Sequence, residues 1–572
     1  MKKRSYVLIL ILVFFFLIAA TAVSFLTLSF DRTPSIPPSA YLRLDLAGPI
    51  VDYPGSGFWT AFLPVGRMLS VHDIWTTLRM AKVDRRIEGV FLKIGLLECD
   101  WAKCAEIREA VLDFRRSGKK AVAYLEELPE GDKEYYLATG CDRVVLHPLG
   151  WIGINGLGGF VPFFKKGLDK IGIRAEFEHV EEFKTAYNQF TESGFTPAHR
   201  EMMESLLQSR FDDYVAAVAE ARKKTPEEVR ALIDRAFFQG DQARDAGLVD
   251  DVAYEDEAVS LWVRDGRRAK PVPLAVYERL DPSSLGLNTG RRIALIYGQG
   301  AIHGGTGTPQ TMGSDTVAGW FQAAREDASI SAVVFRVDSP GGSAVASDAI
   351  WREVELTRKK KPVVVSMSDV AGSGGYWVSM GADKIIAQSQ TLTGSIGVIS
   401  GKFDLSGLAA KLGITAEKIT YGEKADIFSP YRPMTSAERD LFKKQILWIY
   451  DRFTAQAAEG RHMTAEAVDR VGRGRVWTGR QARELGLVDE LGGLPKAIET
   501  AKTLAGIDAG AEVSLAVWPK RIPFLASFFG RRKTEAAAFP AGFLPEDWRS
   551  ALNWAMRLNQ DRVWAVMPLL PE

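Results

Sequence analysis

The 572 residues exceed what one hydrophobic core usually serves, so two domains plus appendages are expected. With 47% hydrophobic and 25% charged residues, the composition is that of a globular protein and excludes a disordered or fibrous chain. Lys and Arg number 72 against 71 Asp and Glu, so the net charge of +1 gives no global basic field, and nucleic acid is not an expected partner.

The N-terminus has the pattern of a membrane anchor. Basic residues 2–4 precede an almost unbroken apolar run over residues 6–30, which is long enough to span a bilayer. A cleavable signal peptide has a shorter apolar region and a small-residue cleavage site, and no clear site follows here. We therefore expect a transmembrane anchor at residues 1–30, with its basic end in the cytoplasm and the rest of the chain on the other side. A Pro-containing linker at residues 31–40 follows.

The remainder of the chain contains a tandem repeat. The segment FFQGDQARDAGLVDDV from Phe237 returns as VWTGRQARELGLVDEL from Val476. Likewise YYLATGCDRVVLHP from Tyr135 returns as YWVSMGADKIIAQS from Tyr376, in the same order. Self-similarity of this kind indicates two copies of one structural unit.

Within each copy, short β-branched runs alternate with longer stretches of helical period, which predicts α/β units around largely buried strands. The fold class is therefore α/β, as two tandem domains. The predicted domains are residues 41–285 and 292–510, with a C-terminal extension at 511–572. Two interpretations of this extension are open, namely a packed segment and a helix at the membrane surface.

The cysteines are too few for a disulfide framework. Cys99, Cys104 and Cys141 have no metal-type spacing, and both a single bridge and buried free thiols are compatible with them. No metal-ligand cluster, phosphate-binding loop or dinucleotide fingerprint occurs in the sequence. We expect neither a metal nor a cofactor.

Two glycine-rich turns in the second half carry the candidate chemistry. The loop DSPGGS begins at Asp338 and follows an apolar strand, and AGSGGYW surrounds Ser373 in the same strand-to-helix context. Glycines without a Cβ allow N–H groups such as those of Gly342 and Gly374 to face a developing negative charge. Ser373 at such a turn is a candidate nucleophile, and the alternative is a helix cap made by its hydroxyl.

A comparison of the two halves favours the first interpretation. In gapless alignment around each motif, Gly341 and Gly342 are matched by Glu98 and Cys99, and Ser373 is matched by Asp132. The scaffold is kept in the first half while the candidate chemistry is absent. The pattern predicts one working site for the two domains.

A serine hydroxyl needs a base to become nucleophilic near neutral pH. The six histidines are His72, His147, His179, His199, His303 and His462; none follows Ser373 closely, but the sequence leaves open that a distant histidine meets it in space. Lysine is the other established base, and Lys184 and Lys424 stand at equivalent places in the repeat. Because a lysine base must be neutral, its pKa has to fall well below about 10.4, which predicts a buried, apolar-walled site.

The motifs SPGGS, SGGYW and TLTGSIGV (391–398), with the paired lysine segments, resemble signal peptide peptidase A in its long, duplicated form. The resemblance covers nearly the whole chain after the anchor. It implies tandem crotonase-like domains related to the caseinolytic protease, a Ser/Lys dyad, and cleavage of remnant signal peptides and other apolar peptides. It also implies a homotetramer on the periplasmic side of a bacterial inner membrane, held in the lipid by residues 6–30.

The resemblance assigns roles to individual residues. Ser373 matches the nucleophile, Gly342 and Gly374 match the oxyanion donors, and Ser395 matches the serine that orients the lysine. In the short relatives, serine and lysine come from neighbouring protomers of a ring. If the duplicated chain keeps that ring, the halves alternate around it, and Lys184 of the first half is the base for Ser373.

Lys424 would then face Asp132, where a salt bridge is the natural expectation. The long form lacks a lysine in its second half, whereas Lys424 matches the short form, so Lys424 is the alternative base. Two other function classes compete with the peptidase. A crotonase-like acyl-CoA enzyme needs neither Ser373 nor an anchor, and an inactive membrane scaffold would not retain Ser373 together with Gly342 and Lys184.

Overall fold

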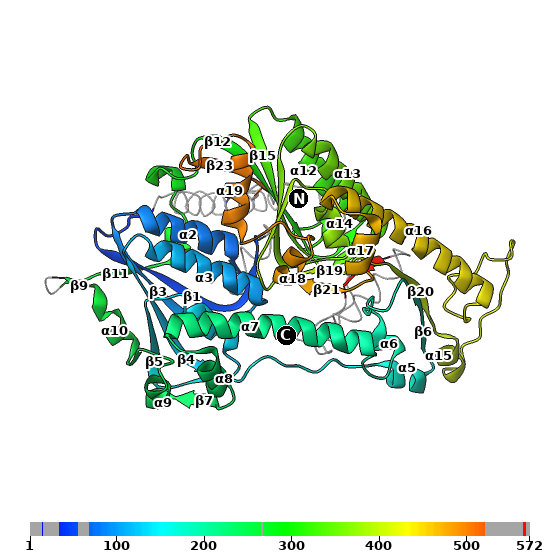
Figure 1. The fold of residues 1–572 in the computed structure, drawn as a ribbon, viewed down its shortest axis with the longest axis horizontal. Helices are drawn as coiled ribbons and strands as arrows, with labels where there is room; N and C mark the ends of the chain where they lie inside the picture. The colour runs from blue at the N-terminus through cyan, green and yellow to red at the C-terminus, as the bar shows by residue number, and fades with distance from the viewer. Residues whose placement is uncertain (1–13, 15–33, 55–67, 265–266, 521–563, 568–572) are drawn as a thin grey trace, which may run out of the picture.

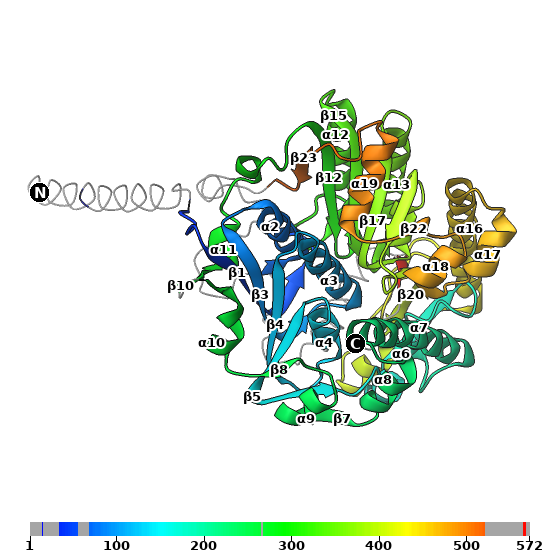
Figure 2. The ribbon, with the colours of Figure 1, turned by 60° about the vertical axis from the view of Figure 1, so that its left-hand side comes forward.

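The computed structural model describes residues 34–54, 68–264, 267–520 and 564–567, together with residue 14. These residues form two α/β units that lie side by side, the first coloured blue to green and the second green to orange (Figures 1 and 2). The expected anchor at residues 6–30 lies outside the described residues except for that one position. In the part of the chain that is described, no helix is both long and apolar enough to cross a membrane.

The first unit is built on a sheet with the strand order β11-β1-β3-β4-β5-β7. Neighbouring strands run parallel, except that β5 and β7 are antiparallel. In addition, β2 pairs with β1 and β8 pairs with β5. The near-continuous burial of β4 is typical of parallel strands covered on both faces. The strands are β1 (Ala40–Val51), β2 (Leu69–Ser70), β3 (Ile87–Glu98), β4 (Lys120–Leu128), β5 (Arg143–Ile154), β7 (Ala236–Gln239), β8 (Asp251–Val252) and β11 (Lys270–Pro273).

The second unit repeats this plan with the order β21-β19-β17-β15-β12-β23. Here β21 is the antiparallel strand, and β18 pairs with β17 and β22. The edge strand β23 falls within the residues assigned from sequence to the C-terminal extension, and it corresponds to β11 of the first unit. The strands are β12 (Arg291–Gln299), β15 (Ile330–Ser339), β17 (Val363–Gly372), β18 (Lys384–Ala387), β19 (Leu392–Gly394), β21 (Val476–Thr478), β22 (Glu490–Leu491) and β23 (Val513–Trp518).

Helices cover both faces of the second sheet, with α12 and α13 on one side and α19 on the other (Figure 1). The long helices α7 and α16 are equivalent, and a threonine N-cap, Thr196 or Thr435, starts each of them. The principal helices are α2 (Val71–Val83), α3 (Trp101–Arg115), α4 (Asp132–Ala138), α7 (Pro197–Arg222), α8 (Pro226–Ile233), α9 (Gly240–Asp245), α12 (Ser314–Glu326), α13 (Ala344–Arg358), α14 (Gly374–Ser379), α16 (Ser436–Arg461), α17 (Ala465–Val471), α18 (Gly479–Glu484) and α19 (Leu494–Leu504). The shorter elements are α5 (Lys165–Ile171), α6 (Asn188–Thr191), α10 (Glu255–Ala258), α11 (Leu274–Tyr277), α15 (Ser406–Lys411), β9 (Val263–Arg264), β10 (Arg267–Arg268), and the 3-10 helices η2 (Val259–Trp262) and η3 (Pro282–Leu285).

Equivalent hydrogen bonds recur in the two units. The hydroxyl of Tyr135 donates to the carbonyl of Leu248, 2.7 Å away, and the hydroxyl of Tyr376 donates to that of Leu487, at 3.1 Å. Both tyrosines belong to the short helix that starts at Asp132 in the first unit and directly after Ser373 in the second. The repeat read from sequence is therefore also a repeat of packing.

A third sheet joins the two halves. Its order is β14-β13-β16-β24-β20-β6, and β6 of the first half runs antiparallel to β20 of the second. The chain leaves β6 only a few residues before Lys184, so this pairing delivers the lysine segment to the second unit. The strands are β6 (Arg174–His179), β13 (Ile302–His303), β14 (Met312–Gly313), β16 (Gly341–Ser343), β20 (Ile399–Asp404) and β24 (Trp564–Val566).

Candidate active site

Ser373 occupies the sharp turn between β17 and α14. Its φ of 54° and ψ of −109° are rare for a residue with a side chain, and such a backbone costs about 1–3 kcal/mol. Its N–H donates to the carbonyl of Gly394 at 2.8 Å, which fixes the turn. The hydroxyl makes no capping hydrogen bond to α14, so the helix-cap interpretation is wrong. The side chain is instead fully buried and turned toward Lys184.

The lysine reaches Ser373 from the other half of the same chain. Lys184 Nζ lies 2.7 Å from Ser373 Oγ, 2.8 Å from the carbonyl oxygen of Ser395 and 3.0 Å from Ser395 Oγ. All three residues are 0% exposed. Two glycines of the second half permit this approach, because a Cβ on Gly474 would collide with the Lys184 backbone and one on Gly397 would lie 3.1 Å from Lys184 Cδ.

Burial lowers the pKa of Lys184 well below its ordinary value. Among the described residues, no carboxylate forms an ion pair with this amine that would offset the desolvation. A neutral amine has two N–H groups and one lone pair. The carbonyl and hydroxyl oxygens of Ser395 can accept both N–H groups, which leaves the lone pair to accept the proton of the Ser373 hydroxyl. Ser395 itself has a positive φ of 50° and is held by an N–H bond to the carbonyl of Arg475.

Two backbone N–H groups meet beside the serine. Gly342 lies on β16 and Gly374 begins α14; a Cβ on Gly374 would lie 3.1 Å from the nitrogen of Gly342. Gly341 has a φ of 101°, in the region that favours glycine, and a Cβ there would lie 2.7 Å from the nitrogen of Gly374. Paired N–H donors next to a nucleophile are the arrangement that stabilises a tetrahedral oxyanion.

The structure does not bring Lys424 to this site. Its side chain is 47% exposed and its ion pair is with Glu423, at 3.7 Å. Asp132 accepts hydrogen bonds from the N–H groups of Asn155 and Gly156, and burial raises its pKa to about 6. Within the described chain, no ion pair joins Lys424 to Asp132. None of the six histidines hydrogen-bonds Ser373 in this part of the chain either.

The sequence of the chain matches the model of a peptidase family. The model of "Peptidase family S49" matches residues 113–265 and 355–508, one stretch in each repeat. The chain belongs to peptidase family S49. Family membership makes it a serine-type endopeptidase with peptides as substrates.

Similar proteins occur in a plant and in bacteria. The chain is 35% identical over 485 residues to "Serine protease SPPA, chloroplastic" of Arabidopsis thaliana, covering 83% of this chain and 70% of that protein. It is 32% identical over 491 residues to "Protease 4" of Salmonella typhi, covering 81% and 78%. Among solved structures, a point mutant of ClpP1 from Listeria monocytogenes aligns with 36% of this chain and 94% of its own, with a TM-score of 0.24 and 14% identity.

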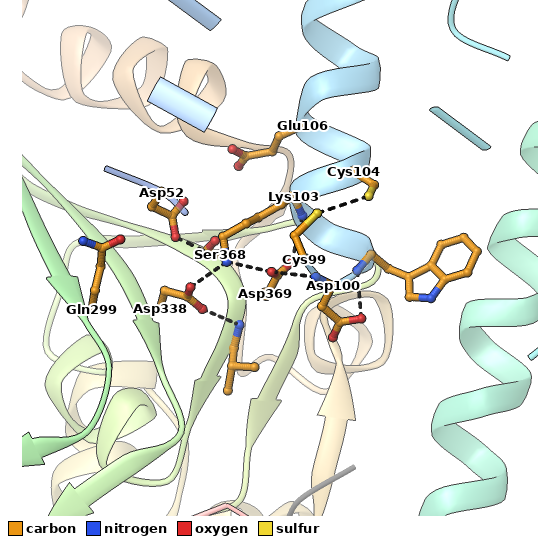
Figure 3. A network of polar contacts seen from close by, with 12 residues as sticks. Asp52, Cys99, Asp100, Lys103, Cys104, Glu106, Gln299, Asp338, Ser368 and Asp369 are labelled. Carbon is orange, nitrogen blue, oxygen red and sulfur yellow. Dashed lines mark hydrogen bonds and ion pairs between the residues drawn. The ribbon is translucent and has the colours of Figure 1, made fainter. Parts of the chain in front are cut away.

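A largely buried ionic network lies between α3 of the first half and strands β15 and β17 of the second (Figure 3). Lys103 Nζ lies 2.6 Å from Asp338 and 2.7 Å from Asp369. Asp338 also accepts the N–H of Val370 at 3.2 Å, so it ties the loop before Gly341 to the strand before Ser373. Lys103 therefore pairs with one carboxylate on each of the two strands, β15 and β17, that lead into the turns of the site.

A second cation extends the network. Arg336 pairs with Asp52 at 2.7 Å and with Glu106 at 2.6 Å, and all three side chains are at most 3% exposed. Desolvation raises the pKa of Glu106 and of Asp338 to about 7, against the lowering effect of the neighbouring cations. Burial alone would lower the pKa of Lys103, yet the carboxylates around it raise that pKa well above its ordinary value. These ion pairs fasten the two halves of the peptidase together.

The C-terminal strand β24 lies against the site. It pairs antiparallel with β16, with Gly342 opposite Ala565, and contacts β20 through Ile399 opposite Trp564. Ala565 is 0% exposed and Met567 is 6% exposed. A segment far along the chain therefore covers the glycine strand of the site.

Several of these features had no signal in the sequence. Gly474 and Gly397 act only through their lack of a side chain beside Lys184, and Lys103 was one lysine among many. Lys103 lies on α3, directly after β3, and β3 is the strand that corresponds to β15 with Asp338. This position could have pointed to Lys103. The cysteines are free thiols, with Cys99 Sγ and Cys104 Sγ 3.5 Å apart.

Proposed function

We propose that the chain hydrolyses peptide bonds with Ser373 as nucleophile and Lys184 as general base. The contact that carries this proposal is the 2.7 Å distance between Lys184 Nζ and Ser373 Oγ in a fully buried setting. Desolvation lowers the pKa of the Lys184 amine, so this amine stays unprotonated at a lower pH than an exposed lysine does. Ser395 orients the amine by accepting its N–H groups.

The reaction follows from this geometry. The lone pair of Lys184 takes the hydroxyl proton as Ser373 Oγ bonds to the substrate carbonyl carbon. The N–H groups of Gly342 and Gly374 stabilise the oxyanion. The tetrahedral species collapses, the C–N bond breaks, and the lysine ammonium protonates the leaving amine. Lys184 then activates a water that hydrolyses the ester on Ser373.

The proposed substrates are remnant signal peptides and other apolar peptides. The resemblance of SPGGS, SGGYW and TLTGSIGV to signal peptide peptidase A supports this class. A cluster of buried apolar side chains that includes Met202, Leu206 and Leu392 lies next to the turn before Ser373 and suits apolar side chains of a substrate.

The proposed location is a bacterial inner membrane. Residues 6–30 act as a single-pass anchor in the lipid, basic residues 2–4 stay in the cytoplasm, and the crotonase-like domains lie on the periplasmic side. The bacterial S49 relatives support a bacterial setting. The proposed assembly is a homotetramer. Since Lys184 and Ser373 meet within one chain, assembly is not needed to complete the pair.

Cleavage of a fluorogenic apolar peptide by the detergent-solubilised protein tests the mechanism. Ser373→Ala and Lys184→Ala should each lower kcat by about a thousandfold or more, because they remove the nucleophile or its base. Lys424→Ala is the matched lysine control and should stay within about twofold of wild type, since that side chain is exposed. Retained activity in Ser373→Ala would refute the mechanism, and selective loss in Lys424→Ala would move the base to the second half.

A further inference from the structure

Two thiols meet at the start of α3, in the half of the chain that lacks the serine. Cys99 directly follows β3, and Cys104 belongs to the beginning of α3. Their sulfur atoms are 3.5 Å apart (Figure 3). A disulfide has an S–S distance of about 2.0 Å, so the two sulfurs would have to approach by about 1.5 Å to form one. Rotation of the two side chains can supply a movement of this size.

The position of this pair in the repeat is informative. In gapless alignment, Cys99 matches Gly342 and Cys104 matches Ser347. The helices α3 and α13 both have 15 residues, so the alignment holds along them. The first unit therefore has a pair of sulfurs at the place where the second unit has one of its proposed N–H donors.

The residues between the two thiols join the first half to the strand that leads to Ser373. The backbone N–H groups of Asp100 and Lys103 donate to the carboxylate of Asp369 on β17, at 3.1 and 2.8 Å. The ammonium group of Lys103 lies 2.7 Å from the same carboxylate. A bond between Cys99 and Cys104 would close a loop that contains all of these donors. It would therefore fix the turn of the chain that contacts β17.

The two thiols differ in their access to a reagent. Cys99 is only partly buried, and Lys133 Nζ donates to its carbonyl oxygen at 2.9 Å, so a positive charge near this cysteine favours its thiolate. Cys104 is 0% exposed. The hydrogen bond with Cys99, together with burial, raises the pKa of the Cys104 thiol well above its ordinary value. An oxidant therefore reacts first with Cys99, and Cys104 reacts second.

We propose that Cys99 and Cys104 form a reversible disulfide that locks the first turn of α3 onto Asp369. The oxidant is a molecule that itself contains a disulfide, and the proposed periplasmic location is an oxidising compartment. The Cys99 thiolate attacks that disulfide, which gives a mixed disulfide and releases one thiol. The Cys104 sulfur then attacks Cys99 Sγ, and its proton leaves with the second thiol. The two cysteines lose two electrons and the oxidant gains them.

Peptide mapping tests whether the bond forms. The full-length, detergent-solubilised chain is treated with oxidised glutathione and then unfolded, its free thiols are alkylated, and it is digested with trypsin without reductant. Because trypsin cleaves after Lys103, the two cysteines fall in separate peptides, 94–103 and 104–108. These peptides should appear joined by a reducible bond, with Cys141 alkylated. Alkylation of all three cysteines, or a bond from either thiol to Cys141, would overturn the proposal.

Serine substitutions separate the roles of the two thiols. Cys104→Ser should retain one glutathione on Cys99, because the second thiol is absent, whereas Cys99→Ser should stay unmodified, because Cys104 is buried. Cys141→Ser is the matched control and should form the same bond as wild type. A Cys104→Ser chain without glutathione on Cys99 would overturn the proposed order of attack.

Thermal unfolding tests whether the bond locks the turn. The oxidised wild type should unfold at a midpoint roughly 3–8 °C above that of the reduced wild type, and Cys99→Ser should show no such difference. Between the two midpoints, the oxidised form should keep its cleavage of the fluorogenic apolar peptide and the reduced form should lose most of it. Equal midpoints for the two wild-type forms would overturn the locking role. Ser373→Ala should show the same bond and the same shift, so the outcome does not depend on the proposed nucleophile.

Discussion

Replacing Lys103 by methionine tests whether the first half holds the site together. Methionine retains most of the apolar length of lysine but removes the ammonium group that lies 2.6 Å from Asp338 and 2.7 Å from Asp369. The lysine side chain is 6% exposed, so water cannot replace it readily. Removing one partner of a buried ion pair costs about 3–5 kcal/mol, because the remaining charge stays buried without compensation.

The pH dependence has a definite sign. The pKa of Asp338 in the folded chain is about 7, above its ordinary value of 3.8, so the folded state binds this proton more tightly than the unfolded state. The stability from this proton is fully present below pH 3.8 and is lost as the pH rises through 7. Without the positive charge of Lys103, the pKa of Asp338 rises further and the loss grows. We expect a destabilisation of about 3–5 kcal/mol at about pH 8 and a clearly smaller one at about pH 5.5.

Thermal unfolding at both pH values and peptide cleavage at the higher pH measure the effect. At roughly 2–4 °C per kcal/mol for a domain of about 200 residues, the midpoint should fall by roughly 6–20 °C at the higher pH. Since Asp338 links both turns of the site, kcat should fall about tenfold or more below the unfolding temperature. Lys120→Met is the control, because its lysine is 63% exposed and pairs with Asp142 at the surface. A Lys103→Met midpoint equal to that of the control would refute the reasoning.

Two further substitutions probe the dyad and the N–H donors. Lys184→Met should abolish cleavage and should stabilise the fold by about 1–4 kcal/mol at about pH 7. Burial lowers the pKa of this lysine in the folded state, so its protonation disfavours folding at any pH well below the pKa of the unfolded state. Thermal unfolding from about pH 6 to about pH 10 measures whether the midpoint of Lys184→Met is higher than that of wild type, and a lower midpoint near pH 7 would contradict the prediction. Gly341→Ala should reduce kcat about a hundredfold, because its Cβ would collide with the carbonyl of Ala565 on β24 and lie 2.7 Å from the nitrogen of Gly374. Steady-state kinetics close to those of wild type would count against the oxyanion role.

The proximity of the candidate site residues Lys184, Ser373 and Ser395 could be predicted because the chain contains two copies of the unit to compare. Alignment of the two repeats matches Ser373 with Asp132 and Lys184 with Lys424. The alternation of halves around a ring then favoured Lys184, and the structure brings this lysine to Ser373 within a single chain. The α/β class followed from the alternation of apolar strands and helical stretches, because that alternation leaves few ways to cover a parallel sheet.

Other features depend on contacts between residues distant in sequence, and no local pattern encodes them. The pairing of β6 with β20 joins two strands that lie in different halves of the chain. The tail offered two interpretations from its composition, whereas the structure uses residues 564–566 as a strand against β16. The network around Lys103 combines charges from both halves, each of which resembles a solvated surface residue when it is read alone.

The degenerate first half has a physical reason to persist. The proposed base, Lys184, needs desolvation to lower its pKa, and the second half supplies it, since Gly474 and Gly397 pack directly against this lysine. Lys103 of the first half in turn pairs with Asp338 and Asp369, which lie on the strands that lead into the glycine turn and the serine turn. Each half therefore completes a charge environment that the other cannot provide. In the proposed mechanism, a first half without a serine lacks only a second nucleophile, whereas loss of Lys184 would abolish cleavage and loss of Lys103 would weaken it.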